Sequence, residues 1–145
     1  MAMKIETPIR VRYAETDMMG VVYHANYLLY MEDARMDFLD KVGLPYMEIE
    51  EAGFMCPVYD VSLNYAHPLR YGEDAFVTTE VSSVRPVKTT YHQEVYRAGM
   101  TPGVDKPLVS ADIVCCIVRR DDFQPVSFKR ELPKLYAKYQ ELLGE

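Results

Sequence analysis

Asp17, Gly20 and His24 lie close together in the stretch ETDMMGVVYHANY, residues 15–27, and their types suit acyl-transfer chemistry. An ionised carboxylate can attack a carbonyl carbon or activate a water molecule. A glycine lets the backbone approach a ligand closely. If a helix begins here, the backbone N–H groups of residues 22–24 are fixed donors that can polarise a carbonyl group. The stretch therefore fits an acyl-transfer site built from contiguous residues.

Each of these residues also has an ordinary structural interpretation. Asp17 can serve as a loop or capping residue, Gly20 as a turn residue, and His24 as a buried histidine with satisfied hydrogen bonds. Asn26 can simply cap the helix. A metal site made of Asp17, His24 and Glu15 has no recognised ligand spacing, so no metal is expected. The spacing of these residues alone does not distinguish an acyl-transfer site from ordinary structural roles.

The elements that must position this stretch are a strand before it and a helix after it. Apolar and charged residues alternate over Ile9–Tyr13, which predicts a half-buried strand. From about Ala25, apolar residues recur at helical spacing and predict a long helix that ends near Val42, where Gly43 can cap it. A second, short helix is expected from Pro45 to about Ala52.

Four later segments are predicted as strands because they are rich in Val, Ile, Thr, Tyr and Phe and are separated by turn residues. They are Pro57–Tyr65, Phe76–Val84, Thr89–Tyr96 and Leu108–Val118. The first of them alternates apolar and polar residues and is expected to be half buried. A terminal helix is expected from about Glu131, after a cap at Ser127 or at Lys129-Arg130.

This order of elements predicts an α+β fold in which one domain occupies residues 1–145. An antiparallel sheet of about five strands should wrap around the long helix, the only element apolar enough to cover the inner face of the sheet. The edges and the second face of the sheet then need protection, which a symmetric partner can supply. A homodimer or a homotetramer is therefore expected.

The composition excludes several classes of protein. The formal net charge of −6 argues against a general nucleic-acid binder, which needs a basic face to neutralise phosphates. No stretch approaches the roughly 20 apolar residues that span a bilayer, and the N-terminus has no signal-peptide core. We expect a cytoplasmic protein without membrane insertion. Its three cysteines, Cys56, Cys115 and Cys116, lack metal-ligand spacing and are expected to be reduced core or sheet residues.

Two segments, RVRYAETDMMGVVYHANYLLYMEDAR and CPVYDVSLNYAHPLRYGED, resemble the hotdog-fold acyl-CoA thioesterases. The similarity is to the group of 4-hydroxybenzoyl-CoA thioesterase and the Tol-Pal-associated acyl-CoA thioesterases, and residues 17–27 carry its specific pattern, D-x-x-G-x-V-x-H/Y-x-x-Y. The resemblance implies a hotdog fold, hydrolysis of an acyl-CoA thioester, and active sites at a dimer interface. It implies no cofactor, because coenzyme A is part of the substrate and product.

The resemblance also implies roles for individual residues. Asp17 matches the catalytic carboxylate, as nucleophile or as general base, and the backbone N–H of His24 matches the donor to the thioester oxygen. Histidine at this position, where the 4-hydroxybenzoyl enzymes have tyrosine, favours the broader acyl-CoA members. The other residues expected to contact substrate are Gly20, Val22, Tyr23 and Asn26 in the same stretch, Tyr59 and His67 from the other subunit, and Arg85, Pro86 and Lys88 as the candidate site for the coenzyme A phosphates.

Other activities remain open from the sequence. An acyl-carrier-protein thioester could replace acyl-CoA without changing any of these residues, since an acidic carrier would also bind Arg85 and Lys88. Hydratases and dehydratases share the hotdog fold, but they place their catalytic histidine and acidic residue differently on the helix. A non-enzymatic acyl-CoA binder is the third alternative.

Overall fold

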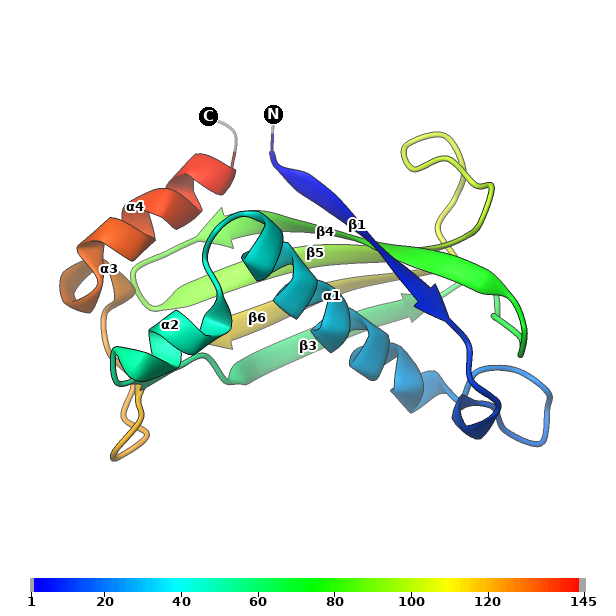
Figure 1. The fold of residues 1–145 in the computed structure, drawn as a ribbon, viewed down its shortest axis with the longest axis horizontal. Helices are drawn as coiled ribbons and strands as arrows, with labels where there is room; N and C mark the ends of the chain where they lie inside the picture. Colours follow the sequence, from blue (N-terminus) through cyan, green and yellow to red (C-terminus); the bar gives the residue numbers. More distant parts are fainter. Residues whose placement is uncertain (1, 144–145) are drawn as a thin grey trace.

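The computed structural model describes residues 2–143, in which a long helix lies across one face of an antiparallel sheet (Figure 1). The five strands of the sheet follow the order β1-β4-β5-β6-β3. Their bounds are β1 Lys4–Arg10, β3 Val58–Tyr65, β4 Asp74–Val84, β5 Lys88–Arg97 and β6 Val109–Cys116. The long helix, α1, spans Tyr27–Lys41. The predicted α+β architecture with a helix on an antiparallel sheet is confirmed.

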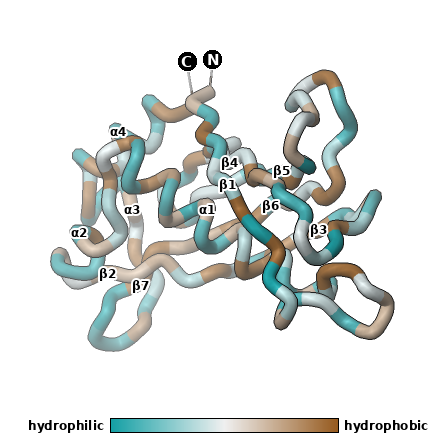
Figure 2. The backbone as a smooth tube through the Cα atoms, turned by 45° about the vertical axis from the view of Figure 1, so that its right-hand side comes forward, coloured by the Kyte–Doolittle hydropathy of each residue, from teal (hydrophilic) through white to brown (hydrophobic). Residues whose placement is uncertain are grey.

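Short elements complete the chain. Helix α2 (Tyr46–Glu51) follows α1, and two-residue strands β2 (Phe54–Met55) and β7 (Val118–Arg119) pair with each other. Helices α3 (Phe128–Glu131) and α4 (Pro133–Leu142) end the described chain. The start of β1 and the end of α4 lie side by side, joined by a hydrogen bond from the Met3 N–H to the Leu142 carbonyl of 3.1 Å (Figures 1 and 2). None of the helices in residues 2–143 is long and apolar enough to cross a membrane.

The core lies between α1 and the inner face of the sheet. Met31, Ala34 and Phe38, spaced at three and four residues along α1, are fully buried. They face strand residues that alternate in and out, such as Val77 on β4 and Val95 on β5, which are fully buried as well. This burial is the main stabilising term, since each large apolar side chain contributes about 1.5–3 kcal/mol. The core thus fixes the axis of α1, and with it the place where the helix begins.

The segment before α1 differs from its prediction. The first strand runs over Lys4–Arg10 rather than Ile9–Tyr13, and Tyr13–Glu15 forms a 3-10 turn, because the Glu15 side chain reaches back to accept from the Arg12 N–H at 2.8 Å. The α-helix begins at Tyr27 rather than near Ala25. His24–Asn26 form a 3-10 turn instead, in which the Asn26 N–H donates to the Tyr23 carbonyl at 2.8 Å.

Two later elements also have boundaries that differ from the predicted ones. The strand predicted over Leu108–Val118 ends at Cys116, and Val118–Arg119 leave the main sheet to pair with β2. The terminal helix begins earlier than Glu131. Ser127 caps α3, its Oγ accepting from the Arg130 N–H at 3.2 Å, which confirms one of the two expected caps. Pro133 then starts α4 as a separate helix, since proline is favoured at a first helical turn.

Strand β3 lies at the edge of the sheet and is exposed on both faces, so the prediction of a half-buried strand was wrong for a single chain. Tyr59, Val61 and Tyr65 keep 63%, 38% and 46% of their surface exposed. The physical reason is position, because an edge strand has a neighbour on one side only. We call the exposed apolar side chains of β3 and α1 the edge band: Val58, Tyr59, Val61 and Tyr65 on β3, and Leu28, Leu29 and Met36 on α1.

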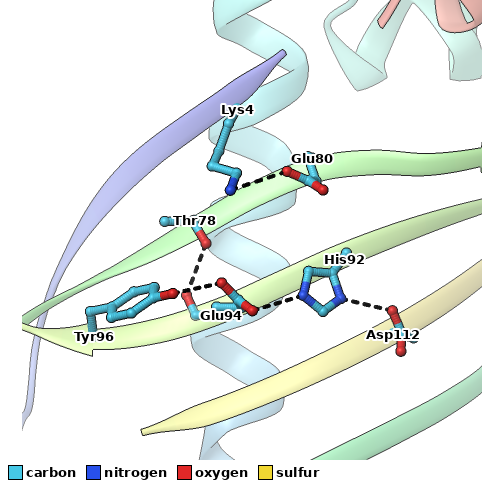
Figure 3. Close-up of polar contacts among 7 residues, drawn as sticks. All are labelled: Lys4, Thr78, Glu80, His92, Glu94, Tyr96 and Asp112. Carbon is cyan, nitrogen blue, oxygen red and sulfur yellow. Dashed lines mark hydrogen bonds and ion pairs between the residues drawn. The ribbon is translucent and has the colours of Figure 1, made fainter. Parts of the chain in front are cut away.

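The outer face of the sheet carries a polar cluster centred on His92, a residue to which the sequence assigned no role (Figure 3). Its Nδ1 lies 2.9 Å from an Asp112 carboxylate oxygen on β6, and its Nε2 lies 3.0 Å from Glu94 on β5. Partial burial opposes protonation of the ring, but the hydrogen bonds to Glu94 and Asp112 outweigh it and raise the pKa of His92. When the ring is protonated, its ion pair with Asp112 joins β5 to the neighbouring strand β6.

We expect the replacement His92→Gln to destabilise the fold in a pH-dependent way. Because the pKa of His92 is raised in the folded state, its stabilisation is fully present below the unfolded pKa and is lost as the pH rises through the folded pKa. The free energy of unfolding should fall by about 0.5–1 kcal/mol near about pH 5.5 and by much less near about pH 9. Urea unfolding of both proteins at the two pH values measures this difference. An equal loss at both would contradict the ion-pair assignment.

Candidate active site

A pocket of about 250 Å³ lies where the loop before α1 meets the end of β3. Figure 1 shows this loop and the end of β3 on its right-hand side. The pocket brings together four residues proposed from the sequence, Asp17, Val22, His24 and His67. His67 was expected from the other subunit, but here it belongs to the same chain as Asp17. The rest of its lining is Met19, Val21, Tyr27, Tyr65, Ala66 and Pro68. The carboxylate and the start of the helix therefore face one hollow, as an acyl-transfer site requires.

Asp17 is held by a tight turn. Its backbone N–H donates to the Val21 carbonyl at 3.0 Å, and its carbonyl accepts from the Gly20 N–H at 2.9 Å. Gly20 has φ of +78°, a left-handed conformation that glycine adopts without strain. One carboxylate oxygen, Oδ1, accepts from the Met19 N–H at 2.8 Å. The second carboxylate oxygen has no hydrogen-bond partner within residues 2–143, so it is available for chemistry.

The backbone N–H groups expected to polarise a carbonyl are not all available. The Val22 N–H donates to the Leu69 carbonyl at 2.8 Å, and the Tyr23 N–H donates to the Glu15 carbonyl at 2.9 Å. The expectation of three free donors at residues 22–24 was therefore wrong for the first two. The His24 N–H, at the first position of the 3-10 turn, has no acceptor in the described part of the chain. Of the three N–H groups at residues 22–24, that of His24 remains as a donor beside the pocket.

Glu15 holds the segment that contains Asp17 and His24 through hydrogen bonds to its backbone carbonyl and its carboxylate. Its backbone carbonyl accepts from the Tyr23 N–H and from the Asn26 side-chain amide, the latter at 2.9 Å. Its buried carboxylate accepts from the Arg12 N–H and from the Tyr30 hydroxyl, each at 2.8 Å. Burial raises the pKa of Glu15, but the hydrogen bonds from Arg12 and Tyr30 more than offset it and lower the pKa. The Asn26 side chain, which was expected to contact substrate, therefore binds the backbone of this segment and does not line the pocket.

Tyr65 is a pocket residue that sequence reasoning missed. Its hydroxyl donates to the His24 carbonyl at 3.0 Å, and its ring lies edge-on to those of His24 and Tyr27, at 6.3 and 5.7 Å between centroids. The signal was present, since Tyr65 stands two residues before His67 and alternate residues of an extended chain share a face. Tyr65 therefore helps to orient the 3-10 turn that carries the His24 N–H.

The remaining predicted residues lie elsewhere. Tyr23 and Gly20 are exposed on the loop and do not line the pocket. Tyr59 and Lys88 lie together at the opposite end of the sheet, with the Lys88 Nζ 4.2 Å from the centre of the Tyr59 ring. Arg85 and Pro86 occupy the adjacent exposed turn between β4 and β5 (Figure 1). Within one chain, the candidate phosphate residues therefore do not reach Asp17.

A second, open cavity of about 510 Å³ adjoins the pocket, sharing His67 and Pro68 with it. Three cationic residues line it, Arg70, Arg97 and Lys106. Arg97 is already engaged, because it donates to Glu73 at 2.8 Å and to the Pro68 carbonyl at 3.1 Å. Residues 2–143 contain no group of three His, Cys, Asp or Glu side chains arranged to hold a metal ion.

Comparison with known proteins places the chain among thioesterases. The family described as the thioesterase-like superfamily matches residues 11–134. The putative acyl-CoA thioesterase YneP of Bacillus subtilis (strain 168) is 36% identical over 132 residues, which covers 91% of this chain and 92% of that protein. The acyl-CoA thioesterase YbgC of Helicobacter pylori (strain ATCC 700392 / 26695) is 33% identical, covering 88% and 92%.

Solved structures agree with the fold. The DHNA-CoA thioesterase from Staphylococcus aureus superposes with a TM-score of 0.88 at 30% identity, over 97% of this chain and 91% of that one. The 4-hydroxybenzoyl CoA thioesterase from Pseudomonas sp. strain CBS-3 superposes with a TM-score of 0.78, over 94% and 98% of the two chains. At 21% identity, the latter supports the fold alone. The expected hotdog fold is confirmed, and the chain belongs to the thioesterase-like superfamily.

Proposed function

We propose that this protein hydrolyses the thioester of an acyl-CoA, giving a free acid and coenzyme A. The observation that carries the proposal is the pairing, in one pocket, of an Asp17 carboxylate oxygen without a hydrogen-bond partner and a His24 N–H without an acceptor. Names of relatives such as the YneP and YbgC proteins support the same reaction.

The two groups have complementary tasks in this mechanism. The His24 N–H donates to the thioester oxygen and stabilises the negative charge that develops there. Asp17 either attacks the carbonyl carbon, forming an anhydride that water then cleaves, or removes a proton from the attacking water. In both routes the C–S bond breaks and coenzyme A leaves as a thiolate that takes up a proton. Asp17 supplies the nucleophile or base and a backbone amide supplies the polarisation, so the proposed reaction calls for no metal and no cofactor.

We further propose that the working unit is a dimer formed through the edge band. The open edge of β3 presents unpaired backbone groups beside exposed apolar side chains, which a second copy can cover. In an antiparallel pairing of two β3 strands about a two-fold axis, the start of one strand lies opposite the end of the other. Tyr59 and Lys88 at one end would then approach the Asp17 pocket of the partner. This arrangement reunites the two groups of residues that a single chain keeps apart.

The Asp17 carboxylate can be tested by a replacement that keeps its turn. Asp17→Asn retains an oxygen that can accept from the Met19 N–H, so the turn should persist while the nucleophile or base is lost. We expect kcat for acyl-CoA hydrolysis to fall by about a thousandfold or more, measured as free-thiol release from short, medium, long and aromatic acyl-CoAs.

The control for this variant is its stability, measured as the thermal unfolding midpoint, which should stay near that of the wild type. A folded Asp17→Asn protein with nearly wild-type turnover would exclude Asp17 from the reaction. Acyl-CoA binding without turnover in the wild type would point instead to a carrier-protein substrate or to a binding role.

Arg85 and Lys88 are the candidate residues for binding the phosphates of coenzyme A. If Arg85 and Lys88 bind the nucleotide part of coenzyme A across the dimer, the double replacement Arg85→Ala, Lys88→Ala should raise KM for acyl-CoA by about tenfold. It should leave KM for the matching acyl-pantetheine, which lacks the nucleotide, nearly unchanged. Steady-state kinetics on the two substrates measures this selectivity.

The matched control is the pair Arg70→Ala, Lys106→Ala in the adjoining cavity of the same chain. If that pair raises KM for acyl-CoA selectively while the Arg85 and Lys88 pair does not, the phosphates bind beside His67 and the cross-dimer assignment is wrong.

A further inference from the structure

A hollow separate from the Asp17 pocket lies near the start of β3. A cavity of about 350 Å³ lies between α1, α2 and the start of β3. Its walls are mostly apolar or aromatic: Met36, Leu39, Tyr46, Cys56, Pro57, Val58, Tyr91, Cys115 and Tyr139, with Glu32 and Arg35 as the charged members. This volume is at the small end of the range for ligand pockets, which suits one part of a thioester substrate rather than the whole molecule.

Arg35 is the unusual member of this lining. Only 7% of its surface is exposed, although it carries a full positive charge. One guanidinium nitrogen, Nη1, donates to the Gln93 Oε1 on β5 at 3.1 Å. Gln93 is fully buried and is itself fixed, since its side-chain amide donates to the Met31 carbonyl at 2.9 Å and to the Thr79 hydroxyl oxygen at 3.0 Å. The guanidinium is therefore held in one place by a neutral partner.

Within residues 2–143, Arg35 forms no ion pair with a carboxylate. None lies within ion-pair distance of Arg35, and Glu32, which lines the same cavity, keeps its side chain exposed. In that part of the chain, no fully buried side-chain nitrogen or oxygen lacks a hydrogen-bond partner. The remaining N–H groups of Arg35 must therefore be open to solvent, and the cavity that Arg35 lines provides that opening. A buried cation without a counter-charge is costly unless something else supplies one.

The position of the cavity connects it with the proposed reaction. Val58, the first residue of β3, lines this cavity together with Cys56 and Pro57 just before the strand. Tyr65, the last residue of β3, lines the Asp17 pocket together with Ala66 and His67 just after it. An antiparallel pairing of two β3 strands sets these two ends opposite each other. The cavity of one subunit then adjoins the Asp17 pocket of the other, so that a thioester held at Asp17 can extend its acyl group into the partner.

We infer that this cavity binds the acyl group of the substrate and that Arg35 selects an acyl group ending in a carboxylate. The inference rests on the proposed thioesterase function and on the β3 dimer. A guanidinium offers several N–H donors in a planar fork that matches a carboxylate, and the aromatic and apolar walls suit the carbon chain between the two carboxyl carbons. The substrate class is thus the monothioester of a dicarboxylic acid.

The test compares acyl-CoAs of equal chain length that differ only at the far end. Glutaryl-CoA ends in a carboxylate, its methyl ester removes the charge, and pentanoyl-CoA ends in a methyl group. For the wild type we expect kcat/KM for glutaryl-CoA to exceed those for the other two by about tenfold or more, the effect of a hydrogen bond to a charged group. Equal rates, or a preference for pentanoyl-CoA, would overturn the inference without depending on any variant.

The replacement Arg35→Met, which keeps a long side chain but removes the charge, should reduce the glutaryl to pentanoyl ratio by about tenfold. Lys41→Met is the matched control, because it removes a cation from the same helix outside the cavity and should leave the ratio unchanged. A ratio unaffected by Arg35→Met would overturn the assignment. The assignment would also be overturned if Arg35→Met lost the dimer, measured by sedimentation, while the glutaryl to pentanoyl ratio stayed unchanged. Arg35 would then pair with a carboxylate of the partner.

Two further outcomes separate this inference from the proposed function. Calorimetric titration of the Asp17→Asn protein with glutaryl-CoA and pentanoyl-CoA tests selection without turnover, and tighter binding of glutaryl-CoA would support the inference even if hydrolysis by the wild type were undetectable. The wild type could instead hydrolyse 4-hydroxybenzoyl-CoA in preference to glutaryl-CoA, with the same dependence on Arg35. That result would support the proposed thioesterase function and contradict the selection of an acyl group that ends in a carboxylate.

Discussion

The acceptor oxygens of Glu15 hold the segment on which the site depends. This residue is buried at the point where the chain leaves the sheet edge and turns toward α1. Its carbonyl binds the Tyr23 N–H and the Asn26 side chain, and its carboxylate binds Arg12 and Tyr30. The turn with Asp17 and the turn with His24 are thereby anchored to one residue. Their relative position follows from these bonds, and the pocket lies between them.

The parts of the structure that follow from local pattern could be predicted from the sequence. The spacing of Met31, Ala34 and Phe38 gave the buried face of α1, and the alternation of apolar residues gave the strands of the sheet. Asp17 and His24 could be placed near each other because they are close in the chain. The boundaries near Tyr13 and Tyr27 could not, because the 3-10 turns there depend on where Glu15 finds its donors.

Features set by distant contacts escaped prediction for the same reason. The Val22 N–H is consumed by the carbonyl of Leu69, far along the chain, so its unavailability is a property of the folded state. Arg35 stands on a helix among acidic residues and resembles a surface charge in the sequence. Only the placement of α1 over β5 shows that it is buried against Gln93. Exposure of Tyr59 likewise depends on the strand order, which leaves β3 without an outer neighbour.

The polar outer face of the sheet has a consequence for how many copies can assemble. His92, Glu94 and Asp112 satisfy one another on a surface that still meets water, and Lys4 pairs with Glu80 beside them at 3.4 Å (Figure 3). If two such faces stacked, these charges would lose their hydration, and several carboxylates would be brought against their own copies. Lengthening the sheet along β3 carries no such cost, because that edge offers apolar side chains and open backbone groups. The distribution of charge therefore favours the addition of a copy along the β3 edge over stacking of two outer faces. Once two copies have paired about a two-fold axis, both β3 edges are covered and cannot pair with a third copy.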